Sequence, residues 1–305
     1  MMSQESRVKS QEVLASTPKN AMSSAQIEAK KRARNLTMRR ILSQSYLWFL
    51  IVLLYAPIVL IIFFSFTRSK VLGNWTGFTF GLYENLFSGY DRVAQVQVNP
   101  DMYQALLYTL IIAVIAATFA TLLGTLAAIG IYNMRQRSRR AIQLLNSVPM
   151  INPDILTGIS LFLLFVFLHV SKGYVTVVLA HITFCTPYVV LNVLPRLTQL
   201  NPNIYEAALD LGATPSQALS KVLIPQLRPG MVSGFILAFT MSLDDFAVTY
   251  FTAGSSGLET LSTYIYADAR KGGLTPELKP MMTIIFLIVL LVLFFVNFRI
   301  IKKQK

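Results

Sequence analysis

Long apolar stretches separated by short polar ones dominate the chain from residue 46 to its carboxyl end. Each stretch holds about 20 residues or more, the length of helix that crosses roughly 30 Å of hydrocarbon. Five stretches therefore predict membrane-spanning helices, at about 46–66, 104–132, 174–194, 231–251 and 281–298.

A sixth apolar stretch, residues 141–170, is too long for one straight span at a rise of about 1.5 Å per residue. Pro149 and Pro153 predict a break within it. Asn152, Pro153 and Asp154 have the residue types of an N-cap and the first two positions of a new helix. We therefore expect six spans, the third one broken, with Asp154 inside the membrane or at its cytoplasmic edge.

Composition agrees with a membrane protein. Of the 305 residues 54% are hydrophobic and 13% charged, against about 25% charged in soluble domains. The net charge of +13 would suit a nucleic-acid binder, but the basic residues cluster at the ends of apolar stretches, as the positive-inside rule requires. The single Cys185 excludes an intrachain disulfide and a zinc site built from cysteines, and we expect no metal site.

The basic residues also predict the orientation. They gather in residues 1–40, in the turn after residue 132, in the polar segment after Arg196 and at the carboxyl end. We therefore expect both termini in the cytoplasm. Residues 1–40 are polar throughout, so we expect a disordered or loosely helical cytoplasmic tail that binds anionic lipid, followed by a transmembrane domain at 41–305.

One polar segment, residues 201–228, separates the fourth and fifth spans. Its pattern predicts a short helix that Gly212 ends, since glycine adopts the left-handed conformation without penalty. Thr214 then begins a second helix with the spacing of a capping box. We expect Pro225 and Pro229 to end that helix.

Acidic residues inside the spans are the candidates for chemistry. Asp244 and Asp245 lie well within the fifth span if it is helical, where a charge costs several kcal/mol unless it faces a cavity or a partner. Neighbours on a helix point about 100° apart, so both cannot face one narrow path equally. We expect at least one of them to line a translocation route and attract a cation; the alternative is that they cap a broken helix or pair with a basic residue of another subunit. Asp154 is a weaker candidate, because its place at a helix start already explains it.

Other familiar sites are not predicted. The sequence contains neither a G-x-x-x-x-G-K-[ST] phosphate loop nor H-E-x-x-H. His169 and His181 are isolated in apolar surroundings, which favours satisfied core histidines over ligands.

The loop 201–228 carries a family motif. Glu206-Ala207-Ala208, then Gly212 after three residues, then Val222-Leu223-Ile224-Pro225 after nine, resembles the EAA motif of ABC-importer permeases, with Val222 and Ile224 as conservative departures. In that family the loop is a coupling helix that docks on a separate cytoplasmic ATPase. The resemblance implies an ATPase-coupling role for these residues: Glu206, Ala207, Ala208, Asp210, Gly212, Ala213, Ile224 and Pro225.

Three further segments are similar to the second permease subunit of spermidine/putrescine ABC importers. They are YAPIVLIIFFSFTRSK at 55–70, NPDILTGISL at 152–161 and MSLDDFAVTYFTAG at 241–254. The resemblance implies an all-α type I importer permease with six transmembrane helices in the bacterial cytoplasmic membrane. It also implies a homologous permease subunit, a cytoplasmic ATPase dimer that binds ATP and Mg, and an extracytoplasmic substrate-binding protein.

The same resemblance implies that this chain is a transport subunit with no ATPase site or cofactor of its own. Its substrates would be polyamines, and because amines are protonated at neutral pH, acidic pathway residues are chemically sensible.

Several alternatives stay open. Related permeases carry iron, sulfate, thiamine or opines. An ion-coupled secondary transporter would use Asp244 or Asp245 as a proton site. An intramembrane aspartyl protease would need two aspartates facing each other from different spans, such as Asp154 with Asp244, and the flanking residues do not support one. A DNA binder built on the loop 201–225 has little electrostatic basis in the single Lys221.

Overall fold

The computed structural model describes residues 24–67, 69, 73–91, 95–254, 257–271 and 274–304. The chain divides into two compact units, residues 1–61 and 62–305. Helix α2 (Ser24–Phe64) contains the first candidate span, Leu42–Phe64, with Pro57 inside it. Residues 1–23 of the expected tail lie outside the described residues. Residues 24–40 belong to α2. The cytoplasmic, lipid-binding tail expected at residues 1–40 stays a prediction.

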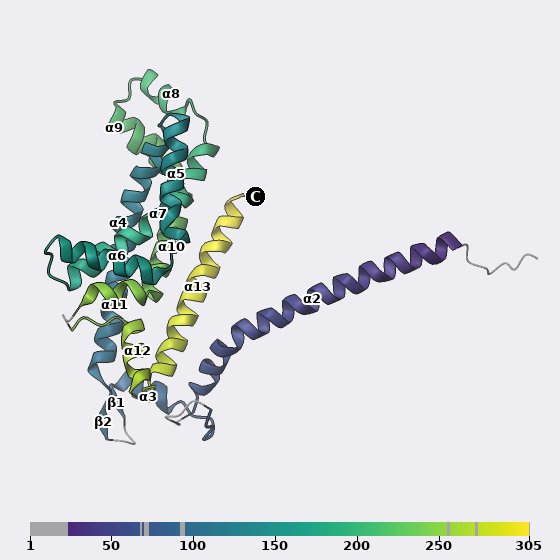
Figure 1. Ribbon diagram of the computed structural model, residues 1–305, viewed down its shortest axis with the longest axis vertical. Coiled ribbons are helices and arrows are strands. Elements are labelled where there is room, and N and C mark those ends of the chain that lie inside the picture. The colour runs from purple at the N-terminus through teal and green to yellow at the C-terminus, as the bar shows by residue number, and fades with distance from the viewer. Residues whose placement is uncertain are drawn as a thin grey trace, which may run out of the picture. The chain divides into compact units, whose positions relative to one another are not determined.

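Three long helices form the centre of the second unit. They are α4 (Pro100–Tyr132), α7 (Tyr174–Gln199) and α10 (Ile224–Asp244), and each packs against the other two (Figure 1). Most buried residues of α4 are alanine, threonine or glycine, with Met102, Ile112 and Ile131 among them, whereas most of its leucines and its phenylalanine are exposed. This inverted pattern suits a bundle in lipid, because small residues let helices approach closely while large ones meet hydrocarbon.

Two glycines of α4 illustrate the pattern. A Cβ added at Gly124 would lie 2.7 Å from the Cβ of Val189 on α7, so only glycine allows this approach. At Gly130, on the same helix, an added Cβ would meet open space. Close packing against α7 therefore requires a glycine at 124 and not at 130.

The third span is broken as predicted. It consists of α5 (Gln136–Ile151) and α6 (Asp154–Phe167), which are bent by 106° at the break. Asp154 is the first helical residue instead of the second, and Asn152 does not cap the helix. The described residues contain five helices long and apolar enough to span a membrane, or six if this bent pair is one span.

The fifth span differs from expectation at both ends. The second helix of the loop does not stop at Pro225 or Pro229; it continues through the π-helix η1 (Ala218–Leu223) into α10. The wider π turn lets a new hydrogen-bond ladder start near Pro225, where its missing N–H is not needed. At the other end α10 stops at Asp244, and a separate helix, α11 (Ala247–Ala253), follows, so the predicted continuous helix 231–251 is wrong.

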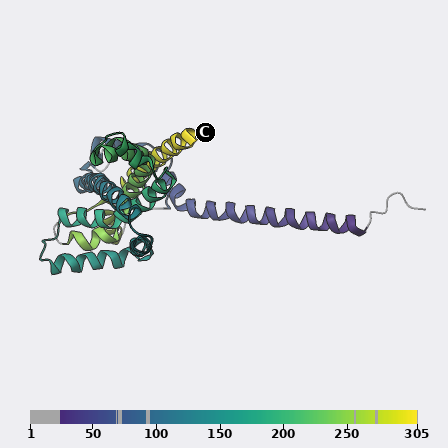
Figure 2. The same cartoon turned by 90° about the horizontal axis from the view of Figure 1, so that it is seen from above.

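The two broken elements meet. α11 packs against α6, and the two run side by side across the bundle (Figure 2). A Cβ added at Gly158 of α6 would lie 3.0 Å from the backbone oxygen of Ala247. The first turns of α6 and α11 are therefore neighbours, which brings acidic residues 90 positions apart in sequence into one region.

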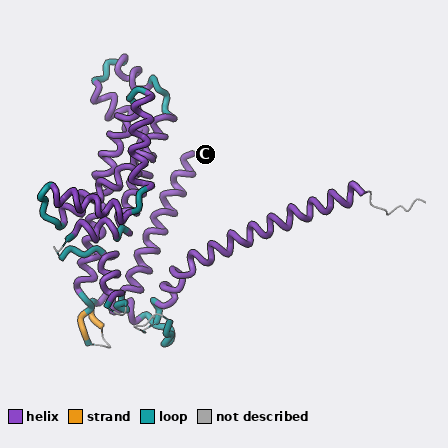
Figure 3. The backbone as a smooth tube through the Cα atoms, viewed as in Figure 1, coloured by secondary structure: helices purple, strands orange, loops and turns teal. Residues whose placement is uncertain are grey.

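The remaining elements lie at the two ends of the second unit. At one end are α8 (Ile204–Asp210) and α9 (Pro215–Gln217). At the other are α3 (Gly81–Ser88), the short antiparallel strands β1 (Tyr90–Asp91) and β2 (Val96–Gln97), α12 (Leu261–Arg270) and the first turns of α13 (Leu278–Gln304) (Figure 3). Lys279 of α13 is buried, and its ammonium group donates a hydrogen bond to the backbone oxygen of Ser69 at 2.7 Å. This bond connects the chain at Ser69 to α13.

Candidate functional site

The loop between α7 and α10 has a rigid turn at its centre. Gly212 has φ +86°, the left-handed conformation that the sequence predicted for it. Its N–H donates to the oxygen of Leu209, and the N–H of Ala213 donates to the oxygen of Ala208, so the last carbonyls of α8 are satisfied. Thr214 and Gln217 form the expected capping box, each side chain accepting from the other's backbone N–H. The loop therefore holds a defined shape without a partner.

The motif residues divide between the surface of this loop and its base. Glu206, Ala207, Asp210 and Gly212 are exposed, whereas Ala208 is buried. Ala213, Ile224 and Pro225 are half-buried. Leu211, at the tip, is 90% exposed although it lies outside the candidate spans. An apolar side chain held in this way on a polar loop is typical of a protein contact.

A cavity of about 420 Å³ lies beneath α8. Its walls come from the carboxyl ends of α4 and α7, from α8 and from η1. Glu206 lines it together with Tyr132 and Tyr205. Movement of α8 is therefore not blocked by close packing on this side.

The second group of residues lies at the break between α10 and α11. The carboxylate of Asp245 accepts hydrogen bonds from the backbone N–H groups of Val248 at 3.2 Å and Thr249 at 2.8 Å. It also accepts from the hydroxyl of Thr249 at 2.9 Å. Asp245 therefore caps α11, which explains why the helix restarts here, as the structural alternative for these acids expected.

His181 of α7 joins the same network. Its Nε2 lies 2.9 Å from the hydroxyl oxygen of Thr249 and 3.4 Å from Asp245, and its Nδ1 lies 2.6 Å from the hydroxyl oxygen of Ser242. Because the Thr249 hydroxyl donates to Asp245, its oxygen is available to accept from Nε2–H. His181 is fully buried and fully bonded, which confirms the satisfied core role, and it ties α7 to both sides of the break.

The other two acids are placed differently from Asp245. Asp244 and Asp154 are both exposed on this chain. Asp154 begins α6 and Asp244 ends α10 directly before α11, so the contact of α6 with α11 places both in one region of the bundle. Among the described residues no group of three or more histidine, cysteine, aspartate or glutamate side chains is placed to hold a metal ion.

The structure thus places Asp154, Asp244 and Asp245 in the region where α6 meets α11, whereas α8 and α9, which carry the motif of the loop 201–228, lie at one end of the bundle. His169 does not have the core role expected of it, because it is exposed at the end of α6 with φ +54°. Ser242 and Thr249, whose hydroxyl groups contact His181, were not predicted from the sequence. The signal that could have identified them is their spacing, because Ser242 lies three residues before Asp245 and Thr249 four residues after it.

A family model described as a binding-protein-dependent transport system inner membrane component matches residues 120–301. The spermidine/putrescine transport system permease protein PotC of Haemophilus influenzae is 36% identical over 82% of this chain and 93% of its own. The PotC of Escherichia coli K12 is 36% identical over 82% of this chain and 90% of its own. The putrescine transport system permease protein PotI of the same strain is also 36% identical, over 76% of this chain and 81% of its own.

Solved structures agree on the fold. A crystal structure of a bacterial ABC transporter that imports the acidic polysaccharide alginate matches with a TM-score of 0.62 and 18% identity, covering 90% of this chain and 99% of that one. The methionine ABC transporter MetNI in an inward-facing conformation matches with a TM-score of 0.52 and 19% identity, over 68% of this chain and 99% of that one. The chain therefore belongs to the binding-protein-dependent transport system inner membrane components, the multi-pass permeases of ABC importers in the bacterial inner membrane.

Proposed function

We propose that this chain is one permease subunit of an ATP-driven importer of polyamines, spermidine or putrescine. It forms the pathway with a homologous subunit. A cytoplasmic ATPase dimer, which binds ATP and Mg, docks on the loop 201–228, and an extracytoplasmic binding protein delivers the substrate. The chain has no ATPase site or cofactor of its own in this proposal, and both of its termini are cytoplasmic.

The observation that carries the proposal is the shape of the loop. Glu206, Ala207 and Asp210 are exposed beside a turn that Gly212 and the Thr214 capping box hold rigid. The loop is continuous with α10 through η1, without an intervening flexible linker. A push on the loop is therefore transmitted along α10 to the break at Asp244, where the acidic residues lie.

The three acids have separate roles in this proposal. Asp245 is engaged by α11 and His181, so it positions the break and does not meet substrate. Asp244 and Asp154 are exposed in the region where α6 meets α11, so they face the pathway and attract the protonated amines. A carboxylate there is stabilised by a cationic substrate and costly without one. The relatives named as spermidine/putrescine permeases support a polycationic substrate.

The test is ATP hydrolysis by the chain reconstituted in proteoliposomes with its sister permease, its ATPase and the binding protein. We expect hydrolysis to rise on addition of the binding protein loaded with spermidine or putrescine. Stimulation by the protein without dependence on polyamine would keep the importer and assign another solute, such as iron, thiamine or an opine. Failure to assemble with any ATPase would favour the ion-coupled transporter instead.

A further inference from the structure

His181 is a buried histidine of α7, and its two ring nitrogens contact two different helices. Nδ1 lies 2.6 Å from the hydroxyl oxygen of Ser242 in α10, and Nε2 lies 2.9 Å from that of Thr249 in α11. Ser242 lies two residues before Asp244 in the chain, and Thr249 lies five residues after it. One side chain of α7 therefore contacts the chain on both sides of the residue that ends α10.

The hydrogen bonds of this network have a definite order. The hydroxyl of Thr249 donates to the carboxylate of Asp245 at 2.9 Å, so its oxygen accepts from Nε2–H of His181. In a neutral imidazole the other nitrogen is an acceptor, and the hydroxyl of Ser242 donates to it. The bonds thus run in one direction, from Ser242 through His181 and Thr249 to Asp245. Loss of the ring would remove a partner from two buried hydroxyl groups.

α7 also contacts α11 near its other end. The hydroxyl of Thr176, at the start of α7, donates to the backbone oxygen of Thr252 at 3.0 Å. α11 has seven residues, and hydrogen bonds join it to α7 at the third and at the sixth of them. The position of α11 therefore depends on α7, although α11 follows α10 in the chain.

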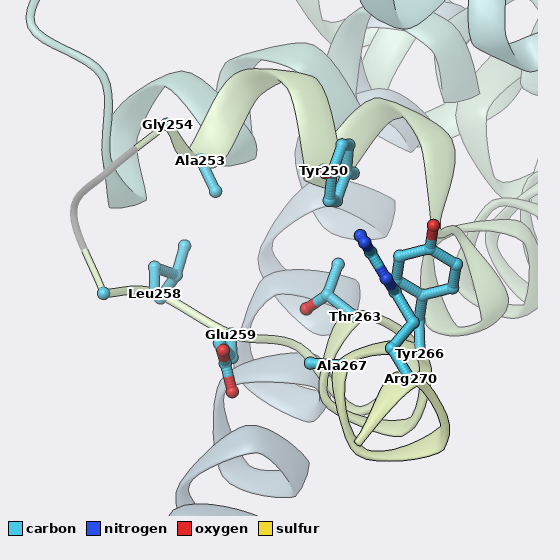
Figure 4. Close-up of a pocket in the computed structure, with 10 residues that line it drawn as sticks. Tyr250, Ala253, Gly254, Leu258, Glu259, Thr263, Tyr266, Ala267 and Arg270 are labelled. Atoms are coloured by element: carbon cyan, nitrogen blue, oxygen red, sulfur yellow. The ribbon is translucent and has the colours of Figure 1, made fainter. Parts of the chain in front are cut away.

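The side of α11 that faces α12 is less closely packed. A cavity of about 740 Å³ lies between these two helices and the loop that joins them (Figure 4). Tyr250 of α11 and Tyr266 of α12 line it, with their ring centres 6.0 Å apart. One hydroxyl of α12, that of Ser262, donates to the backbone oxygen of Asp245. Packing against α12 offers little resistance to a shift of α11 into the cavity, so the bonds to α7 are needed to retain it.

The same contacts determine how Asp244 is presented. Its carboxylate is exposed, and its backbone lies between Ser242 and Asp245, both of which belong to the network of His181. Asp244 is the last residue of α10, and Asp245 after it is extended. A displacement of either neighbour would therefore change the direction in which the carboxylate of Asp244 points.

We propose that His181 is a positioning residue for transport, which holds the break between α10 and α11 so that the carboxylate of Asp244 faces the substrate. His181 does not touch the polyamine, and it acts through Asp244. A charged group selects its ligand efficiently when neighbouring hydrogen bonds fix its position. The inference rests on the proposed function, which assigns Asp244 to the pathway.

The test measures the amount of polyamine moved per ATP hydrolysed. The complete transporter, with its sister subunit, ATPase and loaded binding protein, is reconstituted in proteoliposomes, and uptake and hydrolysis are measured on the same sample. A variant that only folds less well lowers both rates and keeps the wild-type ratio. We expect His181→Leu to lower the ratio about tenfold or more, because it releases the break on both sides.

Two milder variants separate the parts of the network. Ser242→Ala removes the bond on the α10 side and leaves Asp245 bonded to α11, so we expect it to lower the ratio about threefold. His181→Gln should recover part of the loss seen with His181→Leu, because its amide keeps both a donor and an acceptor.

Thr183→Val is the matched control. Thr183 lies two residues from His181 on α7 and is exposed, and its hydroxyl donates to the backbone oxygen of Leu179 in the same helix. The substitution removes a hydroxyl that contacts neither α10 nor α11, so the ratio should stay within about twofold of wild type.

A double-mutant cycle with Asp244 gives a readout that a purely structural role would not change. If His181 acts through Asp244, adding His181→Leu to Asp244→Asn should change the ratio less than about twofold further. Losses that multiply in the double variant would show that the two residues act independently, and they would overturn the proposal.

Three other results would overturn the proposal while leaving the importer in place. One is a wild-type ratio in the assembled His181→Leu transporter, which would limit the histidine to a role in folding. Another is an equal loss with His181→Gln and His181→Leu, which would show that the hydrogen bonds of the ring do not matter. The third is a loss with Thr183→Val as large as that with Ser242→Ala. Normal transport by Asp244→Asn alone would instead contradict the proposed function, because it would remove Asp244 from the pathway.

Discussion

Two adjacent aspartates have different environments at the level of single residues. Asp245 accepts hydrogen bonds from two backbone N–H groups and a hydroxyl, beside a buried histidine. Asp244 is exposed on the same chain. Backbone geometry is the cause, since α10 ends between them and Asp245 takes an extended conformation that turns its side chain back onto α11.

This difference predicts different outcomes for the two substitutions. Asp245→Ala should lower the free energy of unfolding by about 1–3 kcal/mol, because it leaves the first N–H groups of α11 without an acceptor. Thermal unfolding of the purified chain in detergent measures this loss. His181→Ala should behave similarly, and the double variant should lose less than the sum of the single losses, because the residues share one network.

Asp244→Asn should leave stability within about 0.5 kcal/mol of wild type and reduce polyamine uptake about tenfold or more, because it removes a charge from the pathway and keeps an acceptor oxygen on the side chain. Uptake in proteoliposomes and thermal unfolding are measured on the same preparation. Normal uptake by Asp244→Asn, or a stability loss equal to that of Asp245→Ala, would contradict the division of roles.

At the scale of whole helices, packing depends on single small residues at the contact. The approach of α4 to α7 depends on Gly124, whereas Gly130, on the same helix, meets nothing. The two glycines are indistinguishable by sequence context, since both lie among alanines and apolar residues. They differ because only one faces Val189.

Gly124→Ala should therefore lower thermal stability by about 1–3 kcal/mol through overpacking against Val189. Gly130→Ala is the matched control, and it should be neutral or stabilising by up to about 1 kcal/mol, since alanine is the better helix former. Adding Val189→Ala to Gly124→Ala should restore part of the loss. Equal effects at the two glycines would show that this helix contact is absent in solution.

The coupling loop offers a second test at the scale of the element. Gly212 has φ +86° and no atom within 4 Å of an added Cβ, so a substitution meets conformational strain and no clash. Gly212→Val should cost about 1–2 kcal/mol of turn stability and weaken ATPase co-purification, whereas Gly212→Asn should be tolerated, because asparagine adopts this conformation more readily. Identical ATPase recovery with both variants would indicate that the turn is not part of the docking surface.

The whole molecule is predicted to have a definite orientation in the membrane. The single Cys185 is buried, so thiol reagents should label the wild type only weakly. Labelling of an introduced cysteine can therefore be measured against a low background. In intact spheroplasts, a membrane-impermeant maleimide should label Lys271→Cys and spare Ser216→Cys, and both positions are exposed on the chain. The pattern should reverse in inverted vesicles. Labelling of Ser216→Cys from outside would place the loop 201–228 away from the ATPase and contradict the proposed function.

The sequence by itself determined those properties that depend on local pattern. Apolar stretches, prolines and the pattern of residues 201–228 specify the spans, the broken third span and the turn at Gly212, because hydrogen bonding and burial in lipid act on contiguous residues. Gly212 and the capping box at Thr214 are local in the same sense, and both form as predicted.

Tertiary structure decided what depends on distant residues. The break after Asp244 was predicted only as an alternative to a continuous helix, because it is stabilised by His181 of α7, more than 60 positions away, as well as by Thr249 nearby. The second helix of the loop continues through Pro225 because of the π-helical segment η1, which no local sequence pattern predicts. The same holds for the approach of α6, which begins at Asp154, to α11, which follows Asp244, since only tertiary packing brings these elements together.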